Sequence, residues 1–217
     1  MNPQPFCTFA VSHLPVGVSF VADVEIAGPA RARSLLARRH ALRPAAGTPN
    51  ADAAEYLQLA VKRWRYYLAE GYSPRSLAGA KHRIHAEPEC ELGFLLAARV
   101  CDAARTEAGF CFLRRVWTGR FVVDFLSVHP SAFHPVTGAA QLTGTGAGLL
   151  GAAAKLAVEL GGTGFWGEAT KNSHGFYQRI KSRLGLEIDS PPITDFFRFD
   201  LAELQMMADR LLNRESA

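Results

Sequence analysis

The stretch Gln141-Leu142-Thr143-Gly144-Thr145-Gly146-Ala147-Gly148 runs directly into an apolar segment, Leu149 to Leu160. Its alternate glycines remove side chains where a ligand could approach the main chain. The helix predicted over Ala147 to Leu160 would point its unpaired N–H groups and the positive end of its dipole back at these glycines. The pattern therefore predicts an anion cradle with a phosphate-bearing guest. The alternative is a glycine-rich turn that simply starts a tightly packed helix.

Two common phosphate-binding motifs do not fit this stretch. In a dinucleotide-binding fold, Gly-x-Gly-x-x-Gly lies directly between a strand and its helix. Here Gly146 is followed by Gly148 and then Gly151, and the preceding strand-like run, Phe121 to Val128, ends more than ten residues earlier. A Lys-Ser or Lys-Thr pair after the glycines is also missing, which excludes the ATP-type phosphate loop.

Composition indicates a globular protein of ordinary size. The 217 residues suit one domain, and 48% hydrophobic with 20% charged residues is typical of soluble proteins. The formal charge of +4 would help to hold a polyanionic cofactor, but it is too small to imply nucleic-acid binding without a basic face. No secretory signal pattern opens the chain and no uncharged run has membrane-spanning length, so we expect a cytoplasmic protein.

Cysteine and histidine spacing indicates neither a disulfide framework nor a metal site. The widely spaced cysteines, which form no Cys-x-x-Cys pair, are Cys7, Cys90, Cys101 and Cys111. His82 and His85 stand near Glu87, but no third ligand follows at a fixed spacing.

The first part of the chain predicts one strand and two helices. Val18 to Ile26 ends in alternating order and suits a strand. Ala30 to Leu42 interleaves leucines with arginines and reads as a basic amphipathic helix, either with a solvated face or with a surface for nucleic acid or membrane. A second helix, up to Gly71, carries Trp64 and Tyr67, and core packing is a commoner use of such aromatics than base stacking.

From Leu92 onward the pattern is that of a sheet. Three β-rich runs follow one another: Leu92 to Val100, Gly109 to Val116 and Phe121 to Val128. A short turn separates the last two, which predicts an antiparallel hairpin. Gly164 to Ala169 is a further strand, and strand, helix, strand implies a right-handed crossover to a parallel neighbour. The cradle then lies near the carboxyl end of the Phe121 to Val128 strand, where ligands bind in such sheets.

The remaining segments predict a short helix, a strand and a tail helix. Asn172 or Ser173 starts the short helix, and Thr194 to Phe199 forms the strand. Asp200 with Glu203 then makes an acidic capping box that opens an amphipathic tail helix.

Three motifs occur in order between Phe121 and Ile180. They are Phe121-Val122-Val123-Asp124-Phe125-Leu126-Ser127-Val128-His129-Pro130, Gln141-x-x-Gly144-x-Gly146, and Asn172-Ser173-His174-Gly175-Phe176-Tyr177. The ordered set resembles the core of the GNAT superfamily of acyl-CoA N-acyltransferases: its central strand with a Val-x-Pro ending, its pyrophosphate loop, and the Asn and Phe-Tyr of its next helix. One departure is the insert Ser131 to Ala140, which is longer than the family usually has and would widen or cover the acceptor side.

The resemblance implies an α/β (α+β) fold of GNAT-like type. We expect a mixed, mostly antiparallel central sheet with a parallel strand pair around the buried helix 147–160, and helices on both faces. We also expect a single domain over residues 1–217. Its parts would be an elaborated N-terminal strand and helices (1–91), an acyl-CoA-binding core (92–200) and a C-terminal helix (201–217).

The resemblance also implies a donor site without a metal, in which acetyl-CoA or another acyl-CoA is the co-substrate. The residues expected to bind it are Leu126, Val128, Gln141, Thr143, Gly144, Thr145, Gly146, Ala147, Gly148 and Asn172. Tyr177 is the candidate acid for the leaving thiolate, or else a packing tyrosine. Asp124 and Glu168 are the candidate bases, directly or through water, or else members of structural ion pairs.

The expected activity is acetyl transfer from acetyl-CoA to an amine by direct attack. One alternative is a long-chain N-acyltransferase, similar to acyl-homoserine-lactone synthases, in which the basic helix from Arg31 to Arg43 docks an acyl carrier protein. Another is a catalytically idle CoA-binding module. The expected partners are a small-molecule or peptide amine and, at most, a second copy in a homodimer; no nucleic acid or membrane is expected.

Overall fold

The structure, a computed structural model, describes residues 4–14, 17–37, 51–100, 107–129, 142–169, 173–186 and 196–213. The strands are β1 (Cys7–His13), β2 (Val18–Ile26), β3 (Leu92–Val100), β4 (Glu107–Arg115), β5 (Phe121–Val128), β6 (Leu142–Thr143), β7 (Gly164–Glu168) and β8 (Phe196–Asp200). The helices are α1 (Pro29–Ala37), α2 (Ala51–Ala69), α3 (Leu77–Ala86), α4 (Thr145–Glu159), α5 (His174–Leu184) and α6 (Leu201–Leu212).

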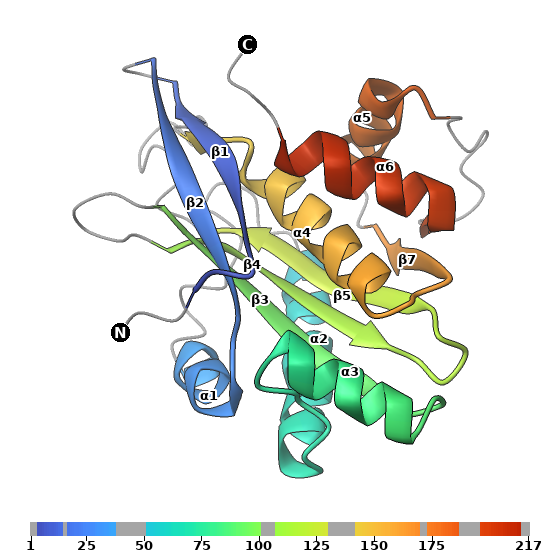
Figure 1. The fold of residues 1–217 in the computed structure, drawn as a ribbon. Coiled ribbons are helices and arrows are strands. Elements are labelled where there is room, and N and C mark those ends of the chain that lie inside the picture. The colour runs from blue at the N-terminus through green and yellow to red at the C-terminus, as the bar shows by residue number, and fades with distance from the viewer. Residues whose placement is uncertain are drawn as a thin grey trace.

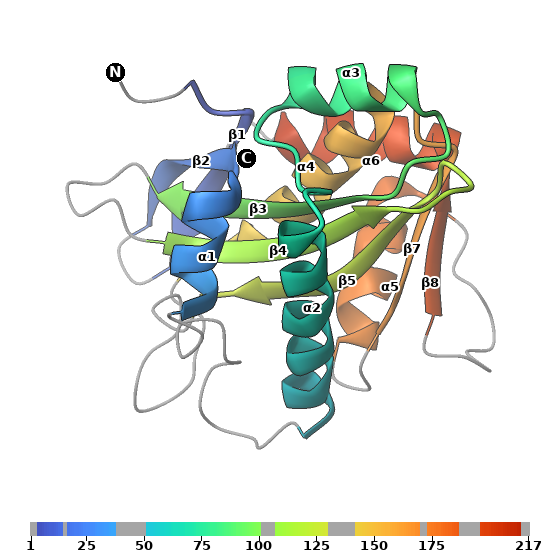
Figure 2. The ribbon, with the colours of Figure 1, turned by 90° about the horizontal axis from the view of Figure 1, so that it is seen from below.

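One mixed sheet organises the described part of the chain. Its strand order is β6-β1-β2-β3-β4-β5-β7-β8, and every pairing is antiparallel except that of β5 with β7. Figure 2 shows α1 and α2 on one face and α3, α4 and α6 on the other. The expected sheet, its parallel pair around the buried helix and helices on both faces are thus confirmed.

Helix α4 forms the centre of the larger core because nearly all of its sides are apolar. Its leucines and alanines are buried among side chains of the sheet, α5 and α6, and Figure 1 shows α4 and α6 side by side. We call this side of the sheet the α4 face. A smaller core under α2 contains Trp64 edge-on to Phe112, with ring centroids 6.1 Å apart. We call that side the α2 face.

Several local signals of the sequence act as predicted. Strands β2, β3 and β5 have the predicted bounds. Gly161, at φ 68°, ends α4 in the left-handed conformation that glycine favours. At α6, Glu203 N–H donates to Asp200 Oδ1 at 2.9 Å and Asp200 N–H donates to Glu203 Oε2 at 2.7 Å, so the capping box is confirmed.

Other elements depend on tertiary pairing that the sequence pattern did not indicate. β1 alternates buried Phe9 and Val11 with less buried neighbours, and it joins the sheet between β2 and the two-residue β6. Neither strand was predicted. The predicted basic helix is α1 as far as Ala37, and residues 38–43 lie outside the described ranges.

Candidate functional site

The amino end of α4 carries backbone N–H groups that the helix leaves without acceptors. Its N-cap is Gly144, whose φ of 94° is left-handed and which offers no side-chain cap. A Cβ at this position would lie 3.0 Å from the carbonyl oxygen of Ala10 in β1, so only glycine fits. The first intrahelical bond runs from Gly148 N–H to Gly144 C=O at 2.8 Å. The amides of Thr145, Gly146 and Ala147 therefore have no acceptor within the helix.

Two buried polar side-chain atoms near this helix end have no hydrogen-bond partner among the described residues. Thr145 is 1% exposed and its Oγ1 is one of them. The other is Nδ1 of His13, which ends β1 opposite Leu142 of β6. An unsatisfied buried polar atom costs about 1–3 kcal/mol, so such atoms mark places where a ligand or water completes the structure.

The alternate glycines have different roles. A Cβ on Gly148 would lie 2.3 Å from the Phe9 ring, so this glycine lets α4 pack against β1. Because its N–H is already bonded to Gly144, the predicted cradle of residues 143–148 needs a correction: Gly148 is not available to an anion. Gly146 faces the Phe176 ring at 3.3 Å and Val128 at 3.8 Å from its would-be Cβ, which places it between β5 and α5.

Beside this helix end the parallel strands separate. β5 and β7 pair only from Phe121 with Phe165 to Val123 with Gly167, although β5 continues to Val128. The separation coincides with a β-bulge, because Leu113 of β4 pairs with Val123 while the preceding Phe112 pairs with Phe125. Asp124 is the extra residue, and such bulges bend and twist the strand that contains them.

Past the bulge, the edge of β5 that faces away from β4 has no paired strand among the described residues. His129 N–H donates to the carbonyl of Ala108 on the β4 side at 2.7 Å. Because backbone groups alternate in direction along a strand, those of Ser127 also point toward β4, and those of Leu126 and Val128 point the opposite way. Leu126 and Val128, two of the predicted donor-binding residues, thus present their main-chain groups where β7 no longer pairs.

Asp124 is held by two guanidinium groups on the α2 face. Its Oδ1 accepts from Arg63 Nη1 at 2.5 Å and from Arg114 Nε at 3.0 Å, and its side chain is only 7% exposed. Nearby, Tyr67 donates to Glu91 at 3.0 Å, and burial together with this carboxylate raises the pKa of Tyr67 to about 12. The predicted base therefore lies in a structural ion pair, the alternative that the sequence left open.

Glu168 has the opposite surroundings. It ends β7 just beyond the last β5–β7 pair, its side chain is exposed, and no described residue forms an ion pair with it. Phe165 belongs to the core of the α4 face, so alternation along the strand places Glu168 on the α2 face, as it does Asp124. Asp124 and Glu168, the two predicted bases, thus lie on either side of the point where β5 and β7 separate. Of the two, Glu168 has no ion-pair partner among the described residues.

Tyr177 is buried on the α4 face. Its ring stacks on Phe197 of β8 with centroids 3.7 Å apart and planes 14° apart, and Phe176 contacts it edge-on. Burial, and to a smaller extent the Cys111 thiol, raises the pKa of Tyr177 above its ordinary value. The phenol therefore keeps its proton at neutral pH and can donate it in a hydrogen bond.

Several predicted features fall outside the described residues: Gln141, Asn172 and the insert Ser131 to Ala140. Thr143 lies in β6, where its Oγ1 is 3.5 Å from the Ser12 carbonyl oxygen. Within the described ranges, no group of three or more His, Cys, Asp or Glu side chains could hold a metal ion. Nor does any helix found there have the length and apolarity needed to cross a membrane.

Basic residues on α1 are partly used within the fold. Arg31 donates to Glu25 at 3.0 Å and also pairs with Glu107, and Arg99 donates to Glu25 at 2.7 Å. These contacts tie α1 to the sheet, so Arg31 is not free to dock an acidic carrier protein.

Comparison with known proteins gives one partial match. No protein-family model and no curated protein matches the chain. A crystal structure of a Bacillus anthracis str. Ames protein, assigned as a streptothricin acetyltransferase and in complex with acetyl coenzyme A, matches at 15% sequence identity and a TM-score of 0.35. The match covers 50% of this chain and 63% of that one.

Proposed function

We propose that this protein is an acyl-CoA-dependent N-acyltransferase that transfers an acetyl group from acetyl-CoA to an amine. The observation that carries the proposal is a set of groups at the start of α4 that have no hydrogen-bond partner among the described residues, next to the point where β5 and β7 separate. These are the amides of Thr145, Gly146 and Ala147 with the buried Thr145 hydroxyl. Backbone N–H groups at the amino end of a helix are suited to binding a diphosphate, and acetyl-CoA carries a diphosphate.

The donor would lie along the free edge of β5. Its diphosphate would bind the helix amides, with Gly144 supplying the left-handed turn that exposes them. The pantetheine arm would bond to the main chain of Leu126 and Val128, in place of the missing β7 pairing. The thioester would then reach the bulge at Asp124, between the two strands.

The proposed reaction is one nucleophilic substitution at the thioester carbon. The amine nitrogen forms a bond to the carbonyl carbon, the carbon–sulfur bond breaks with its electron pair on sulfur, and the nitrogen loses a proton. Glu168 would take that proton, directly or through water, because it is the unpaired carboxylate beside the separation. Asp124 would instead keep the bulge in shape through Arg63 and Arg114.

Tyr177 would donate a hydrogen bond to the departing thiolate. A thiol's pKa near about 8.5 lies below that of an ordinary phenol, near about 10, and burial raises the pKa of Tyr177 further. Full proton transfer is therefore uphill, and the favoured contribution is a hydrogen bond that stabilises the thiolate as it forms.

The sharpest test is Thr145→Val, which replaces the buried hydroxyl by a methyl of similar shape. Because it removes an unsatisfied polar atom, we expect the free energy of unfolding of the unliganded protein to stay equal or rise by about 1 kcal/mol. Affinity for acetyl-CoA should fall about tenfold, since a hydrogen bond to a charged group is lost. Urea denaturation and isothermal titration calorimetry measure the two effects.

The matched control is Thr118→Val in the exposed β4–β5 turn, which should change neither quantity. Wild-type protein should also gain thermal stability with acetyl-CoA and CoA but not with NAD or ATP. Indifference to every CoA species, or unchanged acetyl-CoA affinity in Thr145→Val, would contradict the proposed donor site.

A further inference from the structure

The α2 face of β5, β7 and β8 carries side chains in three successive rows. Phe165, Phe197 and Phe199 belong to the core of the α4 face, so the residues between them point the other way. The first row is Gly164 with Asp200, and Arg120 lies just before the start of β5. The second row, Val122 with Trp166 and Arg198, is paired across all three strands. The third row is Glu168 with Phe196, beyond the last β5–β7 pair, and Asp124 follows that pair on β5. The third row lies where β5 and β7 separate, so these rows lead from the strand starts to the proposed site of acyl transfer.

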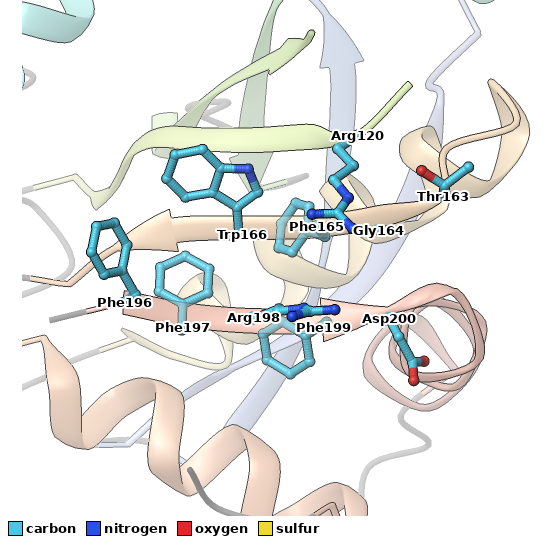
Figure 3. A pocket seen from close by; sticks show the side chains of 10 residues that line it. All are labelled: Arg120, Thr163, Gly164, Phe165, Trp166, Phe196, Phe197, Arg198, Phe199 and Asp200. Carbon is cyan, nitrogen blue, oxygen red and sulfur yellow. The ribbon is translucent and has the colours of Figure 1, made fainter. Parts of the chain in front are cut away.

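A hollow of ≈ 230 Å³ lies along the first two rows and reaches Phe196 of the third. Figure 3 shows Trp166 and Phe196 at one end and the guanidinium groups of Arg120 and Arg198 toward the other. The Trp166 and Phe196 rings are 5.9 Å apart, and Phe196 is 46% exposed. One end of the hollow is therefore aromatic and the other is cationic.

The cationic end has no ion-pair partner in the described part of the chain. Within the described ranges no residue forms an ion pair or a side-chain hydrogen bond with Arg120 or Arg198. Asp200 is the nearest carboxylate in the rows, but its Oδ1 accepts the Glu203 N–H of the α6 capping box. Two unpaired guanidinium groups above a shared hollow complement an anion, because each can donate two parallel hydrogen bonds to a carboxylate or phosphate.

The spacing of the rows sets the shape of the ligand. Two residues along a strand span roughly 7 Å, so the row of Arg198 lies about that far from the row of Glu168, and Arg120 starts about twice as far away. In a ligand with its amine at Glu168 and its anion at Arg198, the part between these two groups would be about the size of a ring. It would contact Trp166 and Phe196. A hollow of ≈ 230 Å³ holds a ring and its substituents, whereas drug-sized ligands need more.

We propose that the acceptor of the acyl group is an amphipathic anion: an amine joined through an apolar or aromatic body to a carboxylate or phosphate roughly 7 Å away. This inference rests on the proposed function, because it assigns the acceptor of the same reaction. Arg120 and Arg198 hold the anion, and Trp166 and Phe196 hold the body. The amine is thereby presented to Glu168 beside the thioester.

Matched probes test the proposal directly. 4-(Aminomethyl)benzoate has an amine and a carboxylate at this separation across a ring, and 4-methylbenzylamine replaces the carboxylate by a methyl group. Their binding to the full chain is measured by calorimetry, with and without CoA, and their acetylation by mass spectrometry. We expect the carboxylate probe to bind at least about tenfold more tightly than the methyl probe, because a charge-assisted bidentate contact is lost in the latter.

Variants decide whether the hollow causes this preference. Arg198→Gln should reduce it severalfold, and the double variant with Arg120→Gln should abolish it. Arg75→Gln, an exposed arginine before α3, is the matched control and should retain it. A third probe, 4-(phosphonomethyl)benzylamine, carries a phosphonate in place of the carboxylate. If it binds more tightly than 4-(aminomethyl)benzoate, the acceptor carries a phosphate-type anion; if it binds less tightly, the acceptor carries a carboxylate.

The outcomes separate the two proposals. Equal binding of the carboxylate and methyl probes, or a preference that survives the double arginine variant, would overturn the anionic acceptor even if acetyl-CoA binds. Failure of acetyl-CoA to stabilise the wild-type protein would instead overturn the acyltransferase assignment. A carboxylate preference that the double variant loses, in protein that acetyl-CoA stabilises, supports both.

Discussion

On the α4 face, the Thr145 hydroxyl and the His13 ring nitrogen Nδ1 are buried without partners in the described part of the chain, whereas on the α2 face the buried carboxylate of Asp124 has two. The start of α4 lies against Val128 of β5 at Gly146, and Asp124 forms the bulge at which β5 separates from β7. Unpaired buried groups cost stability and persist where a ligand completes them, while a satisfied network holds a shape. The comparison supports the proposed ligand binding at the start of α4 and leaves Asp124 as part of a satisfied network at the bulge.

The largest expected effect is that of Tyr177→Phe. Removing the hydroxyl deprives the thiolate of its donor, so kcat should fall roughly 10²- to 10³-fold. Stacking on Phe197 is retained, so acetyl-CoA affinity should hardly change. Release of free thiol gives the rate, and the exposed Tyr66→Phe is the control. A kcat within threefold of wild type would show that the buried phenol only packs.

Glu168→Gln tests the unpaired carboxylate. Without a group to accept the amine proton, kcat/KM at neutral pH should fall roughly 10²-fold, and affinity for acetyl-CoA should be unchanged. The exposed Glu89→Gln serves as the control. If Glu168→Gln kept full activity and Asp124→Asn lost it with no loss of stability, the roles assigned to the two carboxylates would be reversed.

Asp124→Asn should act mainly on stability. It leaves Arg114, with a side chain 19% exposed, and the half-exposed Arg63 without their shared carboxylate. Because Arg63 can turn to solvent, we expect a loss of about 1–3 kcal/mol in the free energy of unfolding, below the cost of breaking a fully buried pair. Urea denaturation measures it, and an unchanged midpoint would contradict the account of the α2 face.

The smallest effect concerns alkaline pH. In the folded protein the pKa of Tyr67 is raised to about 12 and that of Tyr177 is raised as well, whereas unfolded tyrosines ionise near about 10. Above that pH the unfolded state binds fewer protons, so the stability that is fully present below it is lost as pH rises toward 12. Denaturation at several pH values should show this fall, with a shallower slope in Tyr67→Phe. If Tyr67→Phe left the fall of the free energy of unfolding with pH unchanged, the contribution assigned to Tyr67 would be contradicted.

The arrangement around α4 could be predicted because its signals are local. Glycines precede an apolar run, and a β-rich run lies on either side of it. This order predicts a buried crossover helix and a parallel strand pair. The resemblance implies a donor site at the amino end of this helix. The domain division and the catalytic roles remain predictions.

Other features depend on partners far along the chain. The bulge at Asp124 is a mismatch of register between β4 and β5, which no single strand reveals, although the adjacent Phe125 on the same face interrupts the alternation. Arg63 reaches Asp124 from 61 residues away. Likewise, the hollow of Trp166 and Arg198 exists only because β8 returns beside β7.

The most direct test of the central claim follows the backbone amides of α4 by ¹H–¹⁵N NMR during titration with acetyl-CoA. The account predicts that the resonances of Thr145, Gly146 and Ala147 move most, together with those of Leu126 and Val128, while Gly148 moves less because its N–H stays bonded to Gly144. Saturable binding that leaves the first turn of α4 unperturbed would contradict it.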